Sequence, residues 1–303
     1  MAAQDVTYLI AGLAMKVSFP ETFVPAEALP SFLPFMLEIG AASPHICQVE
    51  LSYSPPALKL QDAQLLSDVS VVWGERFRFY ELEDCYLTSI ALEQDQGLCI
   101  MKSSKDFSAA TIYLPDQTYP VYNMLSWMLM VAFGQVCLLH GTILIHASVV
   151  SCRGEGFAFL GKSGTGKSTH SRLWLKHIQN TTLLNDDNPA VRCLPDGQIY
   201  VYGTPWSGKT PCYKNCGIRL KGLVRLQQAA ANKFAVKSGM EALVAVLPSC
   251  TAIRWNKYLF SSMTDTLEAV LKRVVVATLD CLPNQAAAEM CYQEIKKQNI
   301  EII

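Results

Sequence analysis

The sequence Gly-Lys-Ser-Gly-Thr-Gly-Lys-Ser at 161–168 matches G-x-x-x-x-G-K-[ST], the pattern of a phosphate-binding P-loop, or Walker A motif. In such a loop, glycines let backbone N–H groups approach an oligophosphate, the lysine contacts the β and γ phosphates, and the last hydroxyl can bind Mg²⁺. Lys167 and Ser168 occupy the last two positions here. The candidate nucleotide-binding residues are Gly161, Lys162, Ser163, Gly164, Thr165, Gly166, Lys167, Ser168 and Thr169.

The segments on either side of this loop suit the motif. The apolar run at 156–160 predicts a buried strand, and the apolar spacing within 168–178 predicts a helix. The N-terminus of that helix adds partial positive charge to an anion site. A strand, a glycine-rich loop and a helix, in this order, form the context that the motif requires, so we expect a nucleotide to bind here.

Two adjacent carboxylates, Asp186 and Asp187, end an apolar run that begins at Thr182 and predicts a Walker-B-type strand. One of them could hold Mg²⁺ directly or through water, and the other could accept a proton from an attacking hydroxyl. We assign the metal contacts to Ser168 and Asp186 and proton acceptance to Asp187, although the two aspartates could exchange roles. Adjacent acids are more often solvated turn residues, but the preceding apolar run favours the functional interpretation.

His146 begins a further apolar run, which ends in a turn at 152–155. With the strand that follows, this run predicts an antiparallel hairpin in which the paired residue numbers sum to about 307. That register puts His146 opposite Gly161, at the mouth of the phosphate loop. A lone histidine beside a strand is usually a packing or surface residue, but this position makes His146 a catalytic candidate together with the two aspartates.

A second hairpin is predicted at 190–193 and 199–202. Ordinary P-loop GTPases and ATPases continue with helical crossovers in a parallel sheet, so hairpins on both sides of the loop indicate a different architecture. The segment after this hairpin should return beside Asp187 and face the phosphoryl acceptor. Its candidate substrate-loop residues are Trp206, Ser207, Gly208 and Lys209. The alternative is a structural turn with Trp206 in the core.

These motifs together resemble the catalytic domain of HPr kinase/phosphorylase, a family that shares its core with phosphoenolpyruvate carboxykinase. The family pattern is a histidine, a strand-turn-strand, G-x-S-G-x-G-K-[ST], a helix and a strand ending in Asp-Asp. The run Gly-Thr-Pro-Trp-Ser-Gly at 203–208 resembles the signature of HPr-kinase-related proteins that are not HPr kinases themselves. True HPr kinases carry Arg-Gly where this chain has Tyr202-Gly203. The resemblance therefore implies a relative, not a true HPr kinase.

The resemblance covers 120–303 and implies an α/β fold with a P-loop core, a mixed sheet and hairpins. We expect this catalytic domain over 119–303, after a β-rich domain of unknown role over 1–118. The implied activity is that of an ATP- and Mg²⁺-dependent kinase whose acceptor is a hydroxyl, such as a seryl group of a small molecule, peptide or protein. Alternatives are a nucleotide-binding regulatory module with little turnover and a carboxykinase-like phosphotransferase.

Alternating apolar residues also predict strands outside the motifs, and longer periodic runs predict helices toward the C-terminus. The expected strands are 7–17, 46–53, 70–80, 85–92, 109–114 and 222–226, and the expected helices are 239–247, 255–275 and 284–298, with 274–279 alternatively a last strand.

The amino-acid composition limits which binding partners and which cellular compartment we expect. The chain has 303 residues and a formal net charge of −1, which gives no reason to propose nucleic acid or a membrane surface as a partner. Eleven cysteines lie scattered through apolar segments, and the N-terminus lacks a basic signal region, so we expect free thiols in a cytoplasmic protein. The apolar stretch 122–139 contains polar interruptions and predicts a buried helix at the domain junction.

Overall fold

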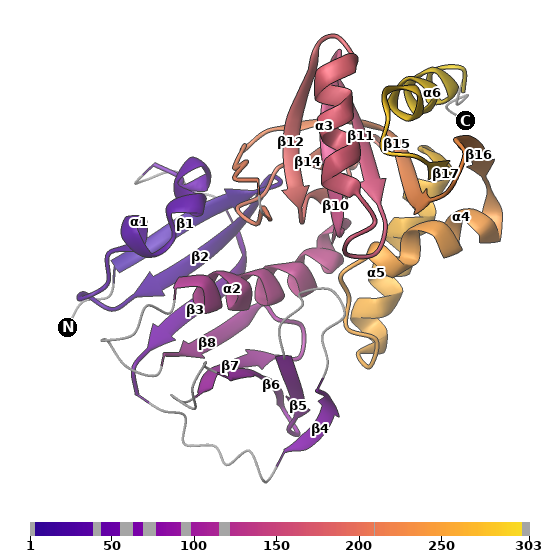
Figure 1. The fold of residues 1–303 in the computed structure, drawn as a ribbon. Coiled ribbons are helices and arrows are strands. Elements are labelled where there is room, and N and C mark those ends of the chain that lie inside the picture. The colour runs from indigo at the N-terminus through magenta and orange to yellow at the C-terminus, as the bar shows by residue number, and fades with distance from the viewer. Residues whose placement is uncertain are drawn as a thin grey trace. The chain divides into compact units, whose positions relative to one another are not determined.

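The computed structural model of the chain describes residues 4–38, 44–54, 63–68, 77–91, 98–114, 122–208 and 210–298. It is a mixed α/β protein with two sheets and several helices (Figure 1). The chain divides into two compact units, Met1–His140 with Ala252–Phe260, and Gly141–Thr251 with Ser261–Ile303. The predicted boundary at 118 thus differs from the division between these units.

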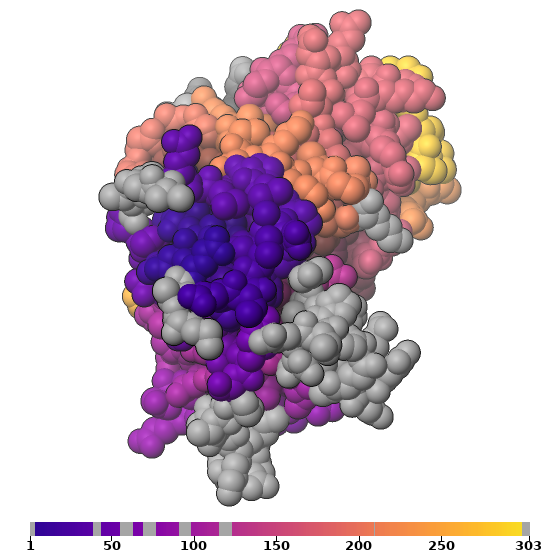
Figure 2. Space-filling model, turned by 90° about the vertical axis from the view of Figure 1, so that its left-hand side faces the viewer, coloured from indigo at the N-terminus to yellow at the C-terminus, as the bar shows by residue number. Residues whose placement is uncertain are grey.

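The first unit is built on an eight-stranded sheet of order β1-β2-β3-β8-β7-β6-β5-β4. Its strands are β1 (Gln4–Ile10), β2 (Leu13–Phe19), β3 (His45–Ser52), β4 (Gln64–Ser67), β5 (Phe77–Glu81), β6 (Cys85–Ala91), β7 (Leu98–Ser104) and β8 (Ala109–Tyr113). Two short helical segments, α1 (Pro25–Ala28) and η1 (Pro30–Phe35), follow β2. Figure 2 shows part of this unit's surface, in indigo to purple.

The long helix of this unit, α2 (Tyr122–Val136), packs against β3, β7 and β8 and continues into the turn η4 (Cys137–His140). The contacts with these strands explain why it belongs to the first unit rather than to the catalytic domain predicted from 119. By length and composition alone, Asn123–His140 could cross a membrane, but 67% of it is buried inside the protein, as expected for a core helix.

The second unit is built on a nine-stranded sheet of order β12-β10-β11-β15-β14-β13-β9, in which β17 pairs with both β15 and β16. Its strands are β9 (Thr142–Leu144), β10 (Ala147–Cys152), β11 (Glu155–Leu160), β12 (Thr181–Asp187), β13 (Ala190–Cys193), β14 (Ile199–Tyr202), β15 (Gly217–Gln228), β16 (Lys233–Lys237) and β17 (Val275–Cys281). Strand β11 is parallel to β15 and antiparallel to β10, so the sheet is mixed.

Helix α3 (Lys167–His177) contacts β10, β11 and β12 and packs beside α6 (Gln285–Lys296) (Figure 1). An aromatic cluster explains this arrangement, because Trp174 lies 4.9 Å from Phe157 and 5.6 Å from Tyr292 between ring centroids. The other helices are α4 (Gly239–Val246), which continues into the turn η5 (Leu247–Ser249), and α5 (Lys257–Leu271).

Several predicted elements differ from the observed ones. The run 7–17 is a hairpin, since Ala11 and Gly12 adopt positive φ angles of 52° and 74° and reverse the chain between β1 and β2. The helix predicted at 255–275 ends at Leu271, and β17 begins at Val275, so the alternative strand is the correct interpretation. Strands β4, β7, β9 and β16 were not predicted, and part of the expected strand 70–80 lies outside the described residues.

Candidate active site

The register of the β10–β11 hairpin agrees with the predicted one. Ala147 pairs with Leu160 and Cys152 with Glu155, so His146 and Gly161 follow directly at the same end of the hairpin. Strand β12 pairs antiparallel with β10, with Asp187 opposite Ala147. The structure therefore brings His146, the start of the predicted phosphate loop and Asp187 to one edge of the sheet.

The predicted phosphate loop connects β11 to α3. Gly161, Gly164 and Gly166 have φ angles of 150°, 79° and 103°, in a region that favours glycine, and Gly166 precedes the first turn of α3. The Lys167 ammonium bends back over the loop and donates to the carbonyl oxygens of Gly161 at 3.1 Å and Lys162 at 3.4 Å. The lysine is thus held where it can meet an anion in the loop.

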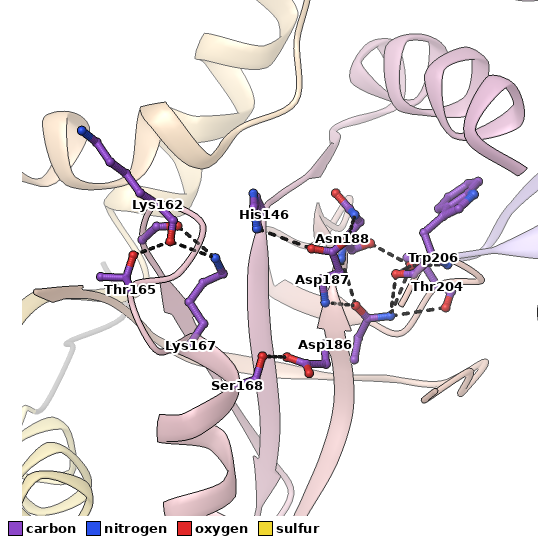
Figure 3. Close-up of polar contacts among 12 residues, drawn as sticks. His146, Lys162, Thr165, Lys167, Ser168, Asp186, Asp187, Asn188, Thr204 and Trp206 are labelled. Atoms are coloured by element: carbon purple, nitrogen blue, oxygen red, sulfur yellow. Dashed lines mark hydrogen bonds and ion pairs between the residues drawn. The ribbon is translucent and has the colours of Figure 1, made fainter. Parts of the chain in front are cut away.

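Ser168 and Asp186 form the first pair of facing side chains (Figure 3). The Ser168 hydroxyl donates to Asp186 Oδ1 at 2.9 Å, and Asp186 is buried at 6% exposure. Ser168 lies in the first turn of α3 and Asp186 near the end of β12, so this contact joins the helix to the sheet edge. Both atoms are hard oxygen donors of the kind that Mg²⁺ binds, and they fit the predicted metal site.

His146 and Asp187 form the second pair (Figure 3). His146 Nε2 lies 3.4 Å from Asp187 Oδ1, and the Asn188 side-chain amide donates to Asp187 Oδ2 at 2.8 Å. The His146 side chain is 19% exposed and that of Asp187 40%, so the carboxylate can still meet a substrate. The backbone N–H of His146 donates to Ser249 O at 2.7 Å, which holds the backbone that carries the histidine.

The ionisation states of these groups differ because their surroundings differ. Burial, and to a smaller extent the charge of Lys167, lowers the pKa of His146 to about 4. Burial raises the pKa of Asp187 to about 6, against the opposing charge of Lys167. Burial also lowers the pKa of Lys167. At neutral pH the site therefore holds a neutral imidazole beside a carboxylate, and the carboxylate is a stronger base than an ordinary aspartate.

Asn185 joins the end of β12 to the segment after β14. Its side-chain amide donates to the carbonyl oxygens of Thr204 and Trp206, both at 3.3 Å. Its Oδ1 accepts from the backbone N–H groups of Asp187 at 3.2 Å and Asn188 at 3.1 Å. Asn185 is fully buried, so this Asn185 network holds the backbone that carries Asp187.

The substrate loop predicted at Trp206–Lys209 lies beside the aspartates. The backbones of Asp187 and Ser207 form a single antiparallel β-bridge outside the named strands. The Gly208 N–H donates to Asp186 O at 2.8 Å. Trp206 is only 4% exposed, so it packs in the interior and does not face an acceptor, in agreement with the alternative of a structural turn with Trp206 in the core. Lys209 lies outside the described residues.

Some residues that shape the site were not predicted from the sequence. Asn185, Asn188 and Thr204 position the aspartates without carrying obvious chemistry, and Thr204 donates to Asn188 O at 2.7 Å. A local signal was present for two of them, since the run Asn185-Asp186-Asp187-Asn188 places amides on both sides of the carboxylates. Ser249 is distant in sequence from every motif, and only the tertiary structure brings its carbonyl to His146.

Comparison with known proteins gives a weak structural similarity. No protein-family model matches the chain, and no curated protein matches it. Among solved structures it is similar to the Hpr(Ser) kinase/phosphatase from Coxiella burnetii, at 9% sequence identity and a TM-score of 0.31. The similarity covers 50% of this chain and 88% of that chain. At this level it assigns no role to any residue, so the geometry of the site carries the functional argument.

Proposed function

We propose that the protein is an ATP- and Mg²⁺-dependent kinase that transfers the γ-phosphoryl group to a hydroxyl acceptor. The observation that carries the proposal is the meeting of two side-chain pairs, Ser168 with Asp186 and His146 with Asp187, at the mouth of one glycine-rich loop. A nucleotide loop, a pair of hard oxygen donors and a base are the parts that phosphoryl transfer to an alcohol requires.

The triphosphate is proposed to bind along residues 161–169. Backbone N–H groups of the loop and the N-terminus of α3 would face the phosphate oxygens. Lys167, whose ammonium contacts the carbonyl oxygens of Gly161 and Lys162, would contact the β and γ phosphates. Ser168 and Asp186 would hold Mg²⁺, which, when bound, offsets the negative charge of the transferring group.

Asp187 is proposed as the base. With a pKa of about 6 it is mostly ionised at neutral pH, and it would accept the proton when the O–H bond of the acceptor breaks. The acceptor oxygen then forms a bond to the γ phosphorus, whose bond to the β–γ bridging oxygen breaks, so that ADP leaves. Neutral His146 is proposed to donate to Asp187 Oδ1 and hold the carboxylate in place.

The acceptor is proposed to carry a seryl-type hydroxyl, in a small molecule, a peptide or a protein. We further propose that the protein acts in the cytoplasm, with neither nucleic acid nor membrane as a partner. A regulatory module would bind ATP without transfer, and a carboxykinase-like enzyme would phosphorylate an enolate instead of an alcohol. These alternatives become outcomes of the test below.

The test measures phosphoryl transfer from labelled ATP with Mg²⁺ to a panel of small alcohols, seryl peptides and proteins. Lys167→Ala removes a charge-assisted contact of about 1.5–3 kcal/mol, so we expect ATP affinity to fall at least tenfold. Lys176→Ala, in the last turn of the same helix, is the matched control and should bind as the parent does.

The outcome separates the alternatives. Equal ATP affinity in Lys167→Ala and the parent, measured by calorimetry, would overturn the nucleotide site. ATP binding without transfer to any alcohol would favour the regulatory module. Transfer to an enolate but to no alcohol would favour a carboxykinase-like reaction.

A further inference from the structure

A cavity lies beside the predicted phosphate loop, and neither Asp186 nor Asp187 lines it. Its volume is about 430 Å³, and all its lining residues belong to the second unit. Loop residues from Gly164 to Gly166 form one rim, and Thr169, which directly follows Ser168, lies at the same end. The remaining walls come from α3, β15 and the segment after β17.

The order of the strands places this cavity at the far end of a bound triphosphate. The loop follows β11, which lies between β10 on one side and β15 on the other. Ser168, Asp186 and the proposed base lie on the β10–β12 side, so the γ phosphate belongs there. The α phosphate then points toward β15 and β17, and β15 is only one strand spacing of about 4.8 Å from β11.

The walls of the cavity suit a flat heterocycle. Leu226 pairs with Leu279 and Gln228 with Cys281, and side chains paired in this way share a face of the sheet. Leu226 belongs to the same buried cluster as Trp174 of α3, so this is the face that α3 covers. Leu173 and Leu282 add apolar surface. Nucleotide cofactor sites combine such apolar walls with a few polar groups that fix orientation.

Gln228 supplies the polar group at the loop side of the cavity. Its Nε2 donates to Gly164 O at 3.3 Å, a long hydrogen bond on an exposed side chain. An amide carries two N–H donors and a carbonyl acceptor, so it can pair with a donor–acceptor edge of a base. Breaking a long, exposed hydrogen bond to pair with a base costs little.

We propose that this cavity binds the base and ribose of the donor nucleotide and that Gln228 contacts the polar edge of the base. The inference rests on the proposed function, since it concerns the same nucleotide. It assigns the nucleoside to the α3-covered face of β15 and β17, a position that none of the sequence motifs indicates. Gln228 is a specificity residue in this proposal, and Leu282 is part of the apolar wall.

The first experiment compares ATP with inorganic tripolyphosphate by calorimetry, because the two share the phosphate chain and only ATP has a nucleoside. We expect the parent to bind ATP at least tenfold more tightly than tripolyphosphate. Leu282→Asn should reduce this ratio at least threefold. Leu175→Asn is the matched control, since Leu175 is also 39% exposed but does not line the cavity, and it should leave the ratio unchanged.

The second experiment tests the polar contact. Gln228→Glu replaces an amide by a carboxylate, which only accepts hydrogen bonds when ionised. Guanine presents adjacent N–H donors on its pairing edge, whereas adenine presents a donor beside an acceptor. We therefore expect the affinity ratio of GTP to ATP to rise at least tenfold. Gln227→Glu adds the same charge on the opposite face of β15 and should leave the ratio unchanged.

Thiol labelling gives a readout that does not need a variant. ATP should slow the alkylation of Cys281 in the cavity, whereas tripolyphosphate should not, and the exposed Cys216 serves as the internal control. Equal affinity of the parent for ATP and tripolyphosphate, or equal effects of Leu282→Asn and Leu175→Asn, would overturn the nucleoside site. An unchanged GTP-to-ATP ratio in Gln228→Glu would overturn the role of Gln228. Failure of both ligands to bind would overturn the proposed function itself.

Discussion

At the scale of single residues, the site depends on two neighbouring groups whose pKa values are displaced in opposite directions. Burial raises the pKa of Asp187 to about 6 and lowers that of His146 to about 4. Burial disfavours the charged form of each group, so an acid becomes a better base and a histidine stays neutral. Such a pair suits proton acceptance near neutral pH.

We expect the rate of phosphoryl transfer to rise with pH through about 6, because Asp187 must lose its proton before it can accept one from the acceptor. The measurement is kcat/KM for the Mg²⁺–ATP complex between pH 5 and 8, because this ratio reports the pKa of the protein before metal and nucleotide bind. ATP affinity over the same range is the control. Asp187→Asn should lower turnover by about 10²–10⁴-fold while retaining ATP binding. A profile without a rise between pH 5 and 7 would argue against Asp187 as the base.

The raised pKa of Asp187 also predicts that its carboxylate lowers the free energy of unfolding at neutral pH. Between the unfolded value of 3.8 and the folded value of about 6, the folded protein keeps a proton that the unfolded chain releases. The free energy of unfolding contributed by Asp187 therefore falls as pH rises through this window. We expect Asp187→Asn to have a higher Tm than the parent at pH 7, and this gain should shrink toward pH 4.

Thermal unfolding at the two pH values measures this difference. The exposed Asp265→Asn is the matched control, because it removes a carboxylate far along the chain from the site. A Tm of Asp187→Asn below that of the parent at pH 7 would contradict the prediction that the buried carboxylate lowers the stability of the folded protein.

At the scale of secondary-structure elements, the site depends on how the end of β12 is held against the segment after β14. The Asn185 network satisfies backbone groups on both segments. Gly208 packs so closely that a Cβ atom there would lie 2.9 Å from Asp186 O. The segment 203–208 therefore acts as a support for the aspartates, which explains why Trp206 is buried.

Asn185→Ala should destabilise this junction, since it removes the side-chain acceptor of the Asp187 N–H and the side-chain donor to Thr204 O. The Asn188 N–H and Trp206 O keep each other as partners at 3.4 Å. An unsatisfied buried group costs about 1–3 kcal/mol, so we expect a loss of at least that size in urea unfolding. Turnover should fall with ATP affinity retained, because Asp187 moves while the loop does not. Thr204→Ser keeps a hydroxyl in the same network and serves as the comparison. Equal unfolding free energies for Asn185→Ala and Thr204→Ser would contradict this account.

At the scale of the whole molecule, the chain passes between its two units more than once. Residues 252–260 belong to the first unit, although they follow residues 141–251 of the second unit in the sequence. There the ring of Trp255 lies 5.3 Å from that of Phe79, and Asn256 donates to Lys105 O at 2.9 Å. The boundary predicted from sequence, at 118, therefore differs from this division, in which residues 252–260 belong to the first unit.

A fragment of residues 119–303 should accordingly be less stable than the full chain. It keeps α2 but lacks β3, β7 and β8, against which that helix packs, so buried apolar side chains such as Met128 and Leu129 become exposed. We expect increased binding of a hydrophobic dye and a lower Tm for the fragment. The full chain purified in parallel is the control, and an equal Tm would show that residues 119–303 fold independently of the rest of the chain.

The sequence by itself determined the local features of this protein. Apolar runs on both sides of a glycine-containing turn were enough to predict the β10–β11 register, since a two-residue turn and alternating side chains leave few other pairings. The G-x-x-x-x-G-K-S spacing likewise predicted the strand, loop and helix order around Lys167. These features depend on residues that are close in the chain, so spacing alone constrains them.

Only the tertiary structure decided which distant segments contact each other at the site. The position of β10 between β11 and β12 brings the His146 side chain within 3.4 Å of Asp187, and residues 247–251 add the carbonyl of Ser249. The burial of Trp206 and the pairing of β16 with β17 also rest on contacts between distant segments. The free energy of such contacts comes from packing and hydrogen bonds that no local pattern records, so it could not be inferred from the order of residues.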